Sequence, residues 1–261
     1  MIELMTRIQS SVLYERMMKS AFATSYGRFL HSSEPDLEHL PKCAETYNRL
    51  ASKSDADIFC FVEDDVEFLT KDWDRIIEEI FIEYDPDIVG VVGASEYNGG
   101  GYFEAGHKTS FGLVACNRSK EDESTFVRIL SPHYHYKKVK VIDGMLMFCK
   151  REFFQKEPFD EKTFDELFYY DIDLCLKSDH VAITSDILVK HSKPAQFYGQ
   201  YPAQMKPASH YEPILLERHR LVKKPIQNQL CCLVSMGTFK TYGQTESYRN
   251  FERKYQCALV S

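Results

Sequence analysis

The stretch Cys60-Phe61-Val62-Glu63-Asp64-Asp65-Val66-Glu67 leads from an apolar run directly into three consecutive carboxylates. A short, nearly continuous apolar run of this kind is typical of a parallel strand that is buried on both faces. Ligands of open α/β sheets bind beyond the carboxyl ends of such strands. Closely spaced carboxylates repel each other there unless a cation neutralises them, and oxygen ligands suit Mn²⁺ or Mg²⁺. The stretch therefore predicts a divalent metal site, with a solvated acidic turn before a helix near Asp72 as the alternative.

The flanking sequence alternates short apolar runs with segments of helical period, which is typical of βαβ units. We expect strands at residues 2–8, 27–31, 57–62, 88–94, 107–116, 139–150 and 181–190. The expected helices are one that can start at Pro41, one over residues 73–84 and one near residues 170–177. A further helical stripe, formed by Tyr14, Met17, Met18 and Phe22, is expected to face the core. The pattern predicts an α/β fold with a mainly parallel sheet flanked by helices.

Composition and charge indicate one domain with an appendage. The chain has 261 residues, of which 44% are hydrophobic and 27% are charged, as in ordinary globular proteins. The net charge of -7 divides into -13 for residues 1–191 and +6 for residues 192–261. Five of the ten prolines lie in the later region, which is typical of a wrapping segment. We therefore expect a domain at residues 1–195 and a basic extension at residues 196–261 that packs on it.

The sequence also gives an expectation for the compartment. No apolar run approaches the roughly 20 residues that span a bilayer, and the N-terminal segment lacks the pattern of a secretion signal. The eight cysteines form no CxxC pair and lie mostly in apolar segments, as reduced core residues do. A cytoplasmic protein is expected, without a structural zinc site.

A second set of polar residues follows later in the chain. It consists of Asp143-Gly144, Phe159-Asp160-Glu161, Tyr170-Asp171-Ile172-Asp173 and the strand-ending His191. Each piece has a plain structural interpretation: the first can form a turn, the aspartates before the helix can cap it, and the histidine can be hydrogen-bonded in the core. The order of the pieces along the chain is more informative than any one of them.

This order resembles GT-A glycosyltransferases, and in particular their inverting bacterial-type superfamily. A strand-ending acidic cluster is followed by V-x-D-G, F-D-E, Y-D-x-D-L before a helix, and a strand that ends in histidine. The sequence resembles a small glycosyltransferase-like branch in which A-x-x-Y-N, here residues 44–48, precedes the acidic strand. Residues 88–94 and 250–255 are similar to later elements of that branch, and the resemblance covers about residues 41–193. The acidic motif departs from the usual D-x-D, because it is Glu63-Asp64-Asp65.

The resemblance implies transfer of a sugar from a nucleotide diphosphate donor to an acceptor hydroxyl, with Mn²⁺ or Mg²⁺ as cofactor and with inversion. Asp65 and His191 are then the expected metal ligands, and Asp171 is the expected catalytic base. The expected donor- or acceptor-binding residues are Asn48, Glu63, Asp64, Asp143, Gly144 and Asp173. Of these, Glu63 can also bind the metal through water, and Asp173 is expected to cap the helix and support the site.

The sequence leaves the nucleobase, the sugar and the acceptor open. Many relatives hold the base with an aspartate after the second strand, where this chain has His31-Ser32-Ser33-Glu34. We expect a glycan or lipid-linked acceptor, and membrane contact through a basic cluster formed by Arg218, Arg220, Lys223 and Lys224. Packing of this cluster against the acidic body is the alternative. Nucleic-acid binding is disfavoured, because the acidic body repels phosphates.

Two other classes of function remain open. A nucleotidyltransferase on a similar fold should carry a glycine-rich basic loop after the first strand, where this chain has Arg7-Ile8-Gln9-Ser10-Ser11. A non-catalytic nucleotide-sugar binding module has no need of both Asp65 and Asp171. His133 and His135 lack a third ligand nearby in sequence, so we expect a loop there and not a metal site.

Overall fold

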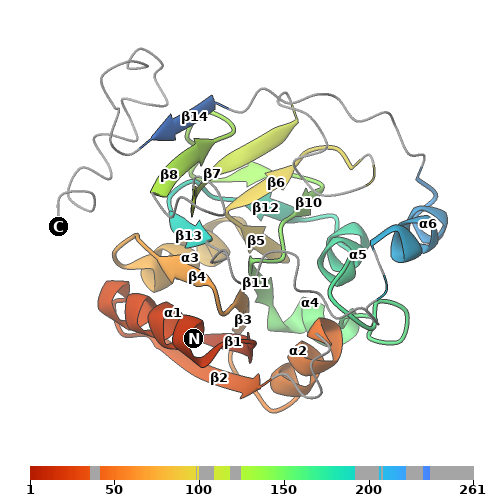
Figure 1. Cartoon of the computed structure of the whole chain (residues 1–261), viewed down its shortest axis with the longest axis horizontal. Helices are drawn as coiled ribbons and strands as arrows, with labels where there is room; N and C mark the ends of the chain where they lie inside the picture. Colours follow the sequence, from red (N-terminus) through yellow and green to blue (C-terminus); the bar gives the residue numbers. More distant parts are fainter. Residues whose placement is uncertain are drawn as a thin grey trace.

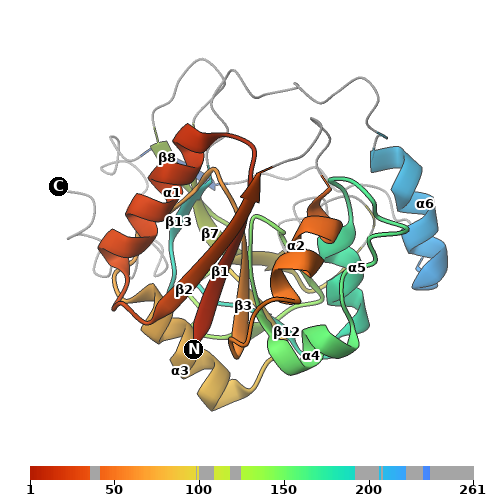
Figure 2. The same cartoon turned by 90° about the horizontal axis from the view of Figure 1, so that it is seen from below.

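The computed structural model describes residues 1–35, 42–97, 99, 109–117, 125–191, 206, 208–221 and 232–235. Helices cover both faces of a central sheet. Figures 1 and 2 show α1 (Ser11–Thr24) and α3 (Trp73–Tyr84) on one side of the strands. On the other side lie α2 (Cys43–Ala51), α4 (Arg151–Lys156) and α5 (Tyr170–Lys177), with α6 (Ala208–Arg218) outside α5. The predicted α/β fold with a helix-flanked sheet is confirmed.

The central sheet has the strand order β2-β1-β3-β11-β5-β12-β9. Its strands are β1 (Ile2–Ile8), β2 (Phe29–Pro35), β3 (Ile58–Glu63), β5 (Ile88–Gly90), β9 (Lys137–Lys138), β11 (Leu146–Lys150) and β12 (Val181–Ile183). Parallel pairs join β1 to β2, β1 to β3, and β5 to β12. β11 lies between β3 and β5 and is antiparallel to both, as β9 is to β12. The sheet is therefore mixed, where the sequence predicted a mainly parallel one, because β11 enters between the parallel pairs in the opposite direction.

A second sheet brings distant strand ends together. It has the order β10-β6-β7-β13-β4, with β8 paired to β7 and β14 paired to β8. Its strands are β4 (Val66–Phe68), β6 (Val92–Ala94), β7 (Ser110–Asn117), β8 (Thr125–Ile129), β10 (Val141–Ile142), β13 (Val189–His191) and β14 (Cys232–Ser235). β4 follows the end of β3 after a two-residue turn, and His191 at the end of β13 pairs with Val66. The ends of β3 and β13 therefore meet.

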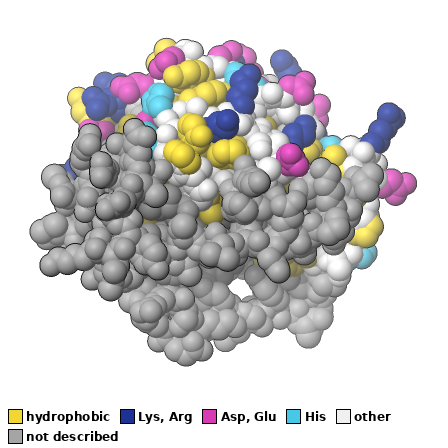
Figure 3. Space-filling model, turned by 90° about the horizontal axis from the view of Figure 1, so that it is seen from above, with side chains coloured by type: hydrophobic (Ala, Val, Ile, Leu, Met, Phe, Trp, Pro, Cys, Tyr) yellow, Lys and Arg dark blue, Asp and Glu magenta, His cyan; other side chains and the backbone are white. Residues whose placement is uncertain are grey.

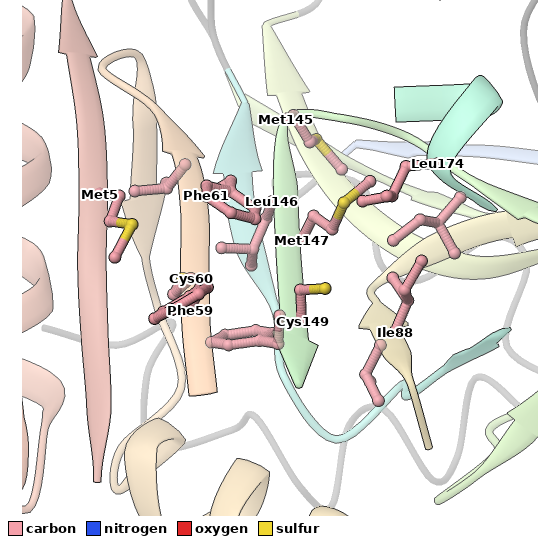
Figure 4. Close-up of a cluster of buried hydrophobic side chains, with 14 of the residues drawn as sticks. Met5, Phe59, Cys60, Phe61, Ile88, Met145, Leu146, Met147, Cys149 and Leu174 are labelled. Carbon is pink, nitrogen blue, oxygen red and sulfur yellow. The ribbon is translucent and has the colours of Figure 1, made fainter. Parts of the chain in front are cut away.

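The core lies against the central sheet. Figure 4 shows side chains of β1, β3, β11 and β5 in one apolar cluster, among them Met5, Phe61 and Leu146. Trp73 anchors α3 to α1, because its buried indole Nε1 donates a hydrogen bond to the carbonyl oxygen of Ala21 at 3.1 Å. Truncation of a buried tryptophan costs about 3–5 kcal/mol, so this contact contributes strongly to the helix layer that covers β1 and β3.

Most of the predicted elements are confirmed. β1, α3 and α5 occupy the predicted residues 2–8, 73–84 and 170–177. α2 begins at Cys43, and Pro41 lies outside the described residues. The prediction for Phe22 was wrong: its side chain is 55% exposed and packs on Phe29, with ring centroids 4.9 Å apart. The reason is that β2 is the edge strand of the sheet, so no further strand covers the last turn of α1 on that side.

Three predicted strands are divided in the structure. Residues 88–94 form β5 and β6, residues 139–150 contain β10 and β11, and residues 181–190 form β12 and most of β13. In each case the two parts belong to different sheets, and a continuous apolar run does not show where the chain passes from one to the other.

No helix among the described residues is long and apolar enough to cross a bilayer. Most of residues 196–261, including 250–255, lie outside the description, so the domain division stays a prediction.

Candidate functional site

The acidic motif lies at the carboxyl edge of the central sheet. Glu63 is the last residue of β3, and Asp64 and Asp65 form the turn into β4. The Glu63 N–H donates to the carbonyl oxygen of Met145 at 3.0 Å, which joins this strand end to the turn before β11. Asp64 and Asp65 are only 4% and 6% exposed. Carboxylates that are buried to this extent need hydrogen-bond donors or a cation.

Glu63, Asp65 and His191 form a candidate metal site, because their ligand atoms all lie within 4.8 Å of one another. The Nε2 atom of His191 is 3.1 Å from Glu63 Oε2 and 3.3 Å from Asp65 Oδ1. Within the described part of the chain, the buried Asp65 Oδ1 accepts no hydrogen bond of good geometry. Two carboxylates and an imidazole, with one carboxylate oxygen left unsatisfied, fit a divalent cation such as Mn²⁺.

The charge state of His191 depends on its two carboxylate neighbours. Burial lowers the pKa of His191, but the carboxylates of Asp65 and Glu63 outweigh this effect and raise the pKa well above its usual value. Without a cation the imidazole is therefore protonated and pairs with both carboxylates. Since a histidine ligand must be neutral, metal binding at this site releases a proton.

Asp64 has different partners. Its Oδ2 atom accepts hydrogen bonds from the backbone N–H groups of Gln9 and Ser10, both at 2.7 Å. Ser10 is the N-cap residue of α1, so Asp64 fixes the connection between β1 and α1. Burial raises the pKa of Asp64 to about 6, against the lowering effect of these two donors. These contacts make Asp64 a support of the edge, and donor binding by this residue stays a prediction.

Asp171 lies in the first turn of α5, against the Asp143-Gly144 turn. A Cβ atom on Gly144 would lie 2.7 Å from Asp171 Oδ2, so only glycine leaves room for this carboxylate. Burial, together with the charge of Asp143, raises the pKa of Asp171 to about 7, although the N–H groups of Ile172, Asp171 and Gly144 lower it. A carboxylate with this pKa can accept a proton near neutral pH, as a general base must.

One turn connects Asp171 with the candidate metal site. The Oδ1 atom of Asp143 accepts a hydrogen bond from the Met145 N–H at 2.9 Å, and the Met145 carbonyl accepts one from Glu63. Gly144, between them, contacts Asp171. The structure therefore brings together at one edge most of the residues that the sequence predicted for the site.

Asp173 and Asn48 make supporting contacts. Asp173 has no exposed surface, and its carboxylate is paired with Lys177 at 2.9 Å and Arg218 at 3.0 Å and hydrogen-bonded to the His219 ring at 2.9 Å. Asn48 joins α2 to the F-D-E segment, because its Nδ2 donates to the Phe159 carbonyl at 2.9 Å and to Glu161 at 2.8 Å. These contacts support positioning roles, and direct contact of either residue with a donor stays a prediction.

Arg7 is a residue of this edge that sequence reasoning missed. It lies near the carboxyl end of β1, pairs in register with both Glu63 and Glu34, and is only 3% exposed. Its positive charge opposes the effect of burial on the pKa of Asp64. A basic residue near the end of a mostly apolar strand, next to the expected ligand-binding edge, was the available signal.

Two other groups of residues from the sequence analysis have partners in the structure. Glu34 accepts hydrogen bonds from Arg49 Nε at 2.6 Å and from Lys53 Nζ at 3.0 Å. These two cations lower the pKa of Glu34, although burial raises it. The segment with His133 and His135 is a loop, as predicted, and both histidines bind the carboxylate of Asp186.

For one member of the basic cluster the structure favours the alternative interpretation, and membrane contact stays a prediction. Arg218 does not project toward an external partner, because it binds Asp160 at 2.7 Å as well as Asp173. Packing against the acidic body, the alternative interpretation, holds for this residue. Lys223 and Lys224 lie outside the described residues.

The sequence matches the model of a family described as "Glycosyltransferase like family" over residues 33–219. The matched segment includes the acidic motif, Asp171, His191 and α6, and it extends past residue 195, where we predicted a domain boundary. Comparison with curated proteins gives no match.

Solved structures of similar fold include GalNAc-T7 with UDP, GalNAc and Mn²⁺, at a TM-score of 0.56 and 9% identity over 83% of this chain and 47% of that chain. Residues 1–349 of S. aureus TarS, in complex with UDP-GlcNAc, have a TM-score of 0.54 and 10% identity over 84% of this chain and 65% of that chain. The chain thus spans less than two thirds of each structure. At these identities the likeness shows the fold alone, which is the GT-A fold.

Proposed function

Because the chain belongs to the glycosyltransferase-like family, we propose that it transfers a sugar from a nucleotide diphosphate donor to the hydroxyl group of an acceptor. The main support for this proposal is the group formed by Glu63, Asp65 and His191. Its members lie at the ends of β3 and β13, which are far apart in sequence, and at the edge of the sheet where Asp171 also lies. The proposed reaction depends on a divalent metal and inverts the configuration of the anomeric carbon.

Asp65 and His191 are the proposed direct metal ligands, and Glu63 binds the ion directly or through water. Mn²⁺ or Mg²⁺, if held by these residues, would supply positive charge to neutralise the negative charge that develops on the leaving diphosphate. The surroundings of Asp65 Oδ1 support this assignment: the oxygen is buried, it has the His191 imidazole at 3.3 Å but no hydrogen bond of good geometry, and a cation there would compensate its charge. Asp64 keeps the loop after β1 in place at the same edge of the sheet.

Asp171 is the proposed catalytic base. As the acceptor oxygen attacks the anomeric carbon, its proton passes to the Asp171 carboxylate and the bond from that carbon to the diphosphate oxygen breaks. Attack from the face opposite the diphosphate produces the inversion. The raised pKa of Asp171, about 7, supports this role, because the carboxylate then has affinity for the proton it must accept.

The acceptor is proposed to be a glycan or a lipid-linked sugar. Membrane contact through the basic extension now depends on Arg220 and on residues beyond the described ones, because Arg218 is engaged with Asp160 and Asp173. Figure 3 shows Lys and Arg side chains interspersed with Asp and Glu on the described part of one face. A surface of mixed sign attracts an anionic leaflet weakly, so the described part of this face adds no support for membrane contact.

Calorimetric titration with a panel of nucleotide sugars, with and without Mn²⁺, tests the proposed donor site. UDP sugars form the first arm, because GalNAc-T7 and TarS were solved with UDP ligands. We expect Asp65→Ala to lose the Mn²⁺-dependent part of donor affinity and to keep its fold. Glu67→Ala is the matched control, because Glu67 is an acidic residue of the adjoining β4 outside the metal group. Unchanged Mn²⁺-dependent binding in Asp65→Ala would remove this metal site from the proposal.

Product analysis then separates the three classes of function. A glycosyltransferase releases the nucleoside diphosphate, slowly to water and faster with an acceptor. A nucleotidyltransferase instead joins a nucleotide to a sugar phosphate and releases pyrophosphate. A binding module binds the donor with Mn²⁺ and releases neither product.

A further inference from the structure

The end of α6 is fastened to the helix that carries the proposed base. Arg218 is the last residue of α6, and its Nη1 lies 3.0 Å from Asp173 Oδ1 in the first turn of α5. The next residue, His219, places Nε2 2.9 Å from the same oxygen. Lys177 of α5 itself lies 2.9 Å from Asp173 Oδ2. A fully buried carboxylate in such a network resists separation, because removal of a partner leaves buried charge without compensation.

Arg218 also holds the segment that precedes α5. Its Nη2 lies 2.7 Å from Asp160 Oδ2 and donates to Thr163 Oγ1 at 2.9 Å. Its guanidinium carbon lies 5.2 Å from the centre of the Phe164 ring. One side chain therefore joins α6, the F-D-E segment and the first turn of α5.

Asp171 lies in the same turn and has little room to move. Gly144 contacts it so closely that one added carbon would lie 2.7 Å from Asp171 Oδ2. The titratable groups that interact with it are Asp143 across the turn, and Tyr170 and Cys175 on α5. A small shift of α5 would change the fit of this carboxylate. Misplacement of a catalytic group by about 1 Å can slow a reaction by about a hundredfold.

We propose that Arg218 and His219 are positioning residues. They bind Asp173 and so hold the first turn of α5 in the position where the Asp171 carboxylate fits against Gly144. The inference rests on the proposed function, because it takes Asp171 as the base. It gives α6 a part in the reaction from a distance, through the helix it binds. The matched family segment ends at residue 219, so these two residues are the last that it contains.

Kinetic comparison of Arg218→Gln with Lys206→Gln tests the proposal. Lys206→Gln is a matched control, because it breaks an ion pair with Asp165 at 2.6 Å in the same part of the fold. We expect Arg218→Gln to lower kcat at least about tenfold while donor KM and Mn²⁺-dependent donor affinity change less than about twofold. Lys206→Gln should stay near the wild type, and Arg218→Lys, which keeps the charge, should regain part of kcat.

A second readout follows the Asp171 carboxyl directly, by ¹³C NMR titration with Asp171→Asn to assign its signal. Loss of the Arg218 charge by itself raises the pKa of a nearby carboxyl, whereas release of Asp171 from its buried fit lowers that pKa toward the usual value. We expect the pKa of Asp171 to fall in Arg218→Gln and to stay unchanged in Lys206→Gln. This measurement needs no turnover.

The outcomes distinguish the two proposals. Transfer that survives in Asp171→Asn refutes the base and thus the proposed mechanism. Normal kcat in Arg218→Gln, with an unchanged or raised Asp171 pKa, refutes the positioning role alone. If thermal melting shows that Arg218→Gln does not fold, His219→Ala is measured in both assays, and wild-type behaviour of that variant overturns the proposal in the same way.

Discussion

The first turn of α5 carries two aspartates whose neighbours have opposite charges. Asp171 lies beside another carboxylate, whereas Asp173 lies among basic side chains. On the side of the β10–β11 turn, Asp171 lies beside Asp143 and against Gly144, and its pKa is raised to about 7. On the side of α6, Asp173 is paired with Lys177, Arg218 and His219. The two residues are separated by one position. Their surroundings leave the first ready to take up a proton and hold the second in a network of ion pairs.

The difference teaches that one helical turn can serve reaction and structure at once. A general base near neutral pH needs a raised pKa, so its anion must have few stabilising partners. The same lack of partners leaves few contacts to hold the carboxylate in position. The neighbouring ion pairs supply the rigidity that the base lacks. The following experiments sharpen or break this comparison.

The largest effect is expected for Asp171→Asn. The amide cannot accept the acceptor proton, so transfer should slow at least about a hundredfold. Donor affinity with Mn²⁺ should remain, because the candidate metal ligands Asp65 and His191 lie on other elements. Initial rates and calorimetric titration measure the two quantities. Near-normal transfer would show that both carboxylates of the turn are structural.

Gly144→Ala should reduce kcat by up to about a hundredfold, because its Cβ would displace the Asp171 carboxylate. The side of α6 should be unaffected, since its ion pairs do not involve this residue. A double-mutant cycle with Asp171→Asn provides the control: once the base is gone, the added methyl group should cost little further rate. Additive losses would mean that Gly144 acts independently of Asp171.

The pH dependence of kcat/KM should report the Asp171 side of the turn. Because the pKa of Asp171 is raised to about 7, its base form is lost as the pH falls through this value. We expect kcat/KM to fall about tenfold per pH unit below about pH 7. Mn²⁺-dependent donor affinity, measured over the same range, separates this effect from protonation of His191. A profile that stays flat to pH 5 with intact donor binding would contradict the assignment.

The smallest effect concerns thermal stability. Substitution of Asp171 and substitution of Asp173 should shift Tm in opposite directions. The folded state raises the pKa of Asp171 from 3.8 to about 7, so it binds this proton more tightly than the unfolded state and loses stability as the pH rises between these values. Asp171→Asn should therefore raise Tm by a few degrees at pH 8, at about 2–4 °C per kcal/mol, and change it little near pH 4.

Asp173→Asn is the comparison for this measurement. It should lower Tm at pH 8, because Lys177 and Arg218 lose a buried carboxylate partner and His219 loses its charged hydrogen-bond partner. Differential scanning calorimetry of both variants decides the matter. A shift of the same sign for both at pH 8 would remove the contrast between the two sides.

The sequence predicted those parts of the site that depend on local pattern. A buried strand running into carboxylates located Asp65, and the Y-D-x-D-L motif before a helix located Asp171, because both features follow from the ends of single elements. The candidate metal site forms only because β13 pairs with β4, which brings His191 beside the acidic motif. This pairing does not follow from local pattern, but the order of the motifs predicted that the residues would meet. The comparisons show the family and the fold, while the residue roles stay proposals.

Contacts between distant segments could not be predicted in this way. Asp64 was predicted to bind donor or acceptor, yet its carboxylate accepts hydrogen bonds from the N–H groups of Gln9 and Ser10, more than fifty positions earlier. Arg218 lies among other basic residues in the sequence and looked like surface, because nothing local reports the buried Asp173 to which it binds. Arg7 was missed because a single basic residue in a strand is most often exposed and has no special role.

The position of β11 has a consequence for the order in which the chain folds. β3 and β5 are synthesised first, and each keeps an unpaired edge until β11 inserts between them. Unpaired edges of apolar strands are open to wrong partners, so we expect the nascent chain to be most prone to aggregation before residue 150 has left the ribosome. The same insertion forms the hydrogen bond from Glu63 to Met145. Insertion of β11 thus closes the central sheet between β3 and β5 and fixes the strand end that carries Glu63, whereas β12, Asp171 and His191 join only after the following forty residues have been synthesised.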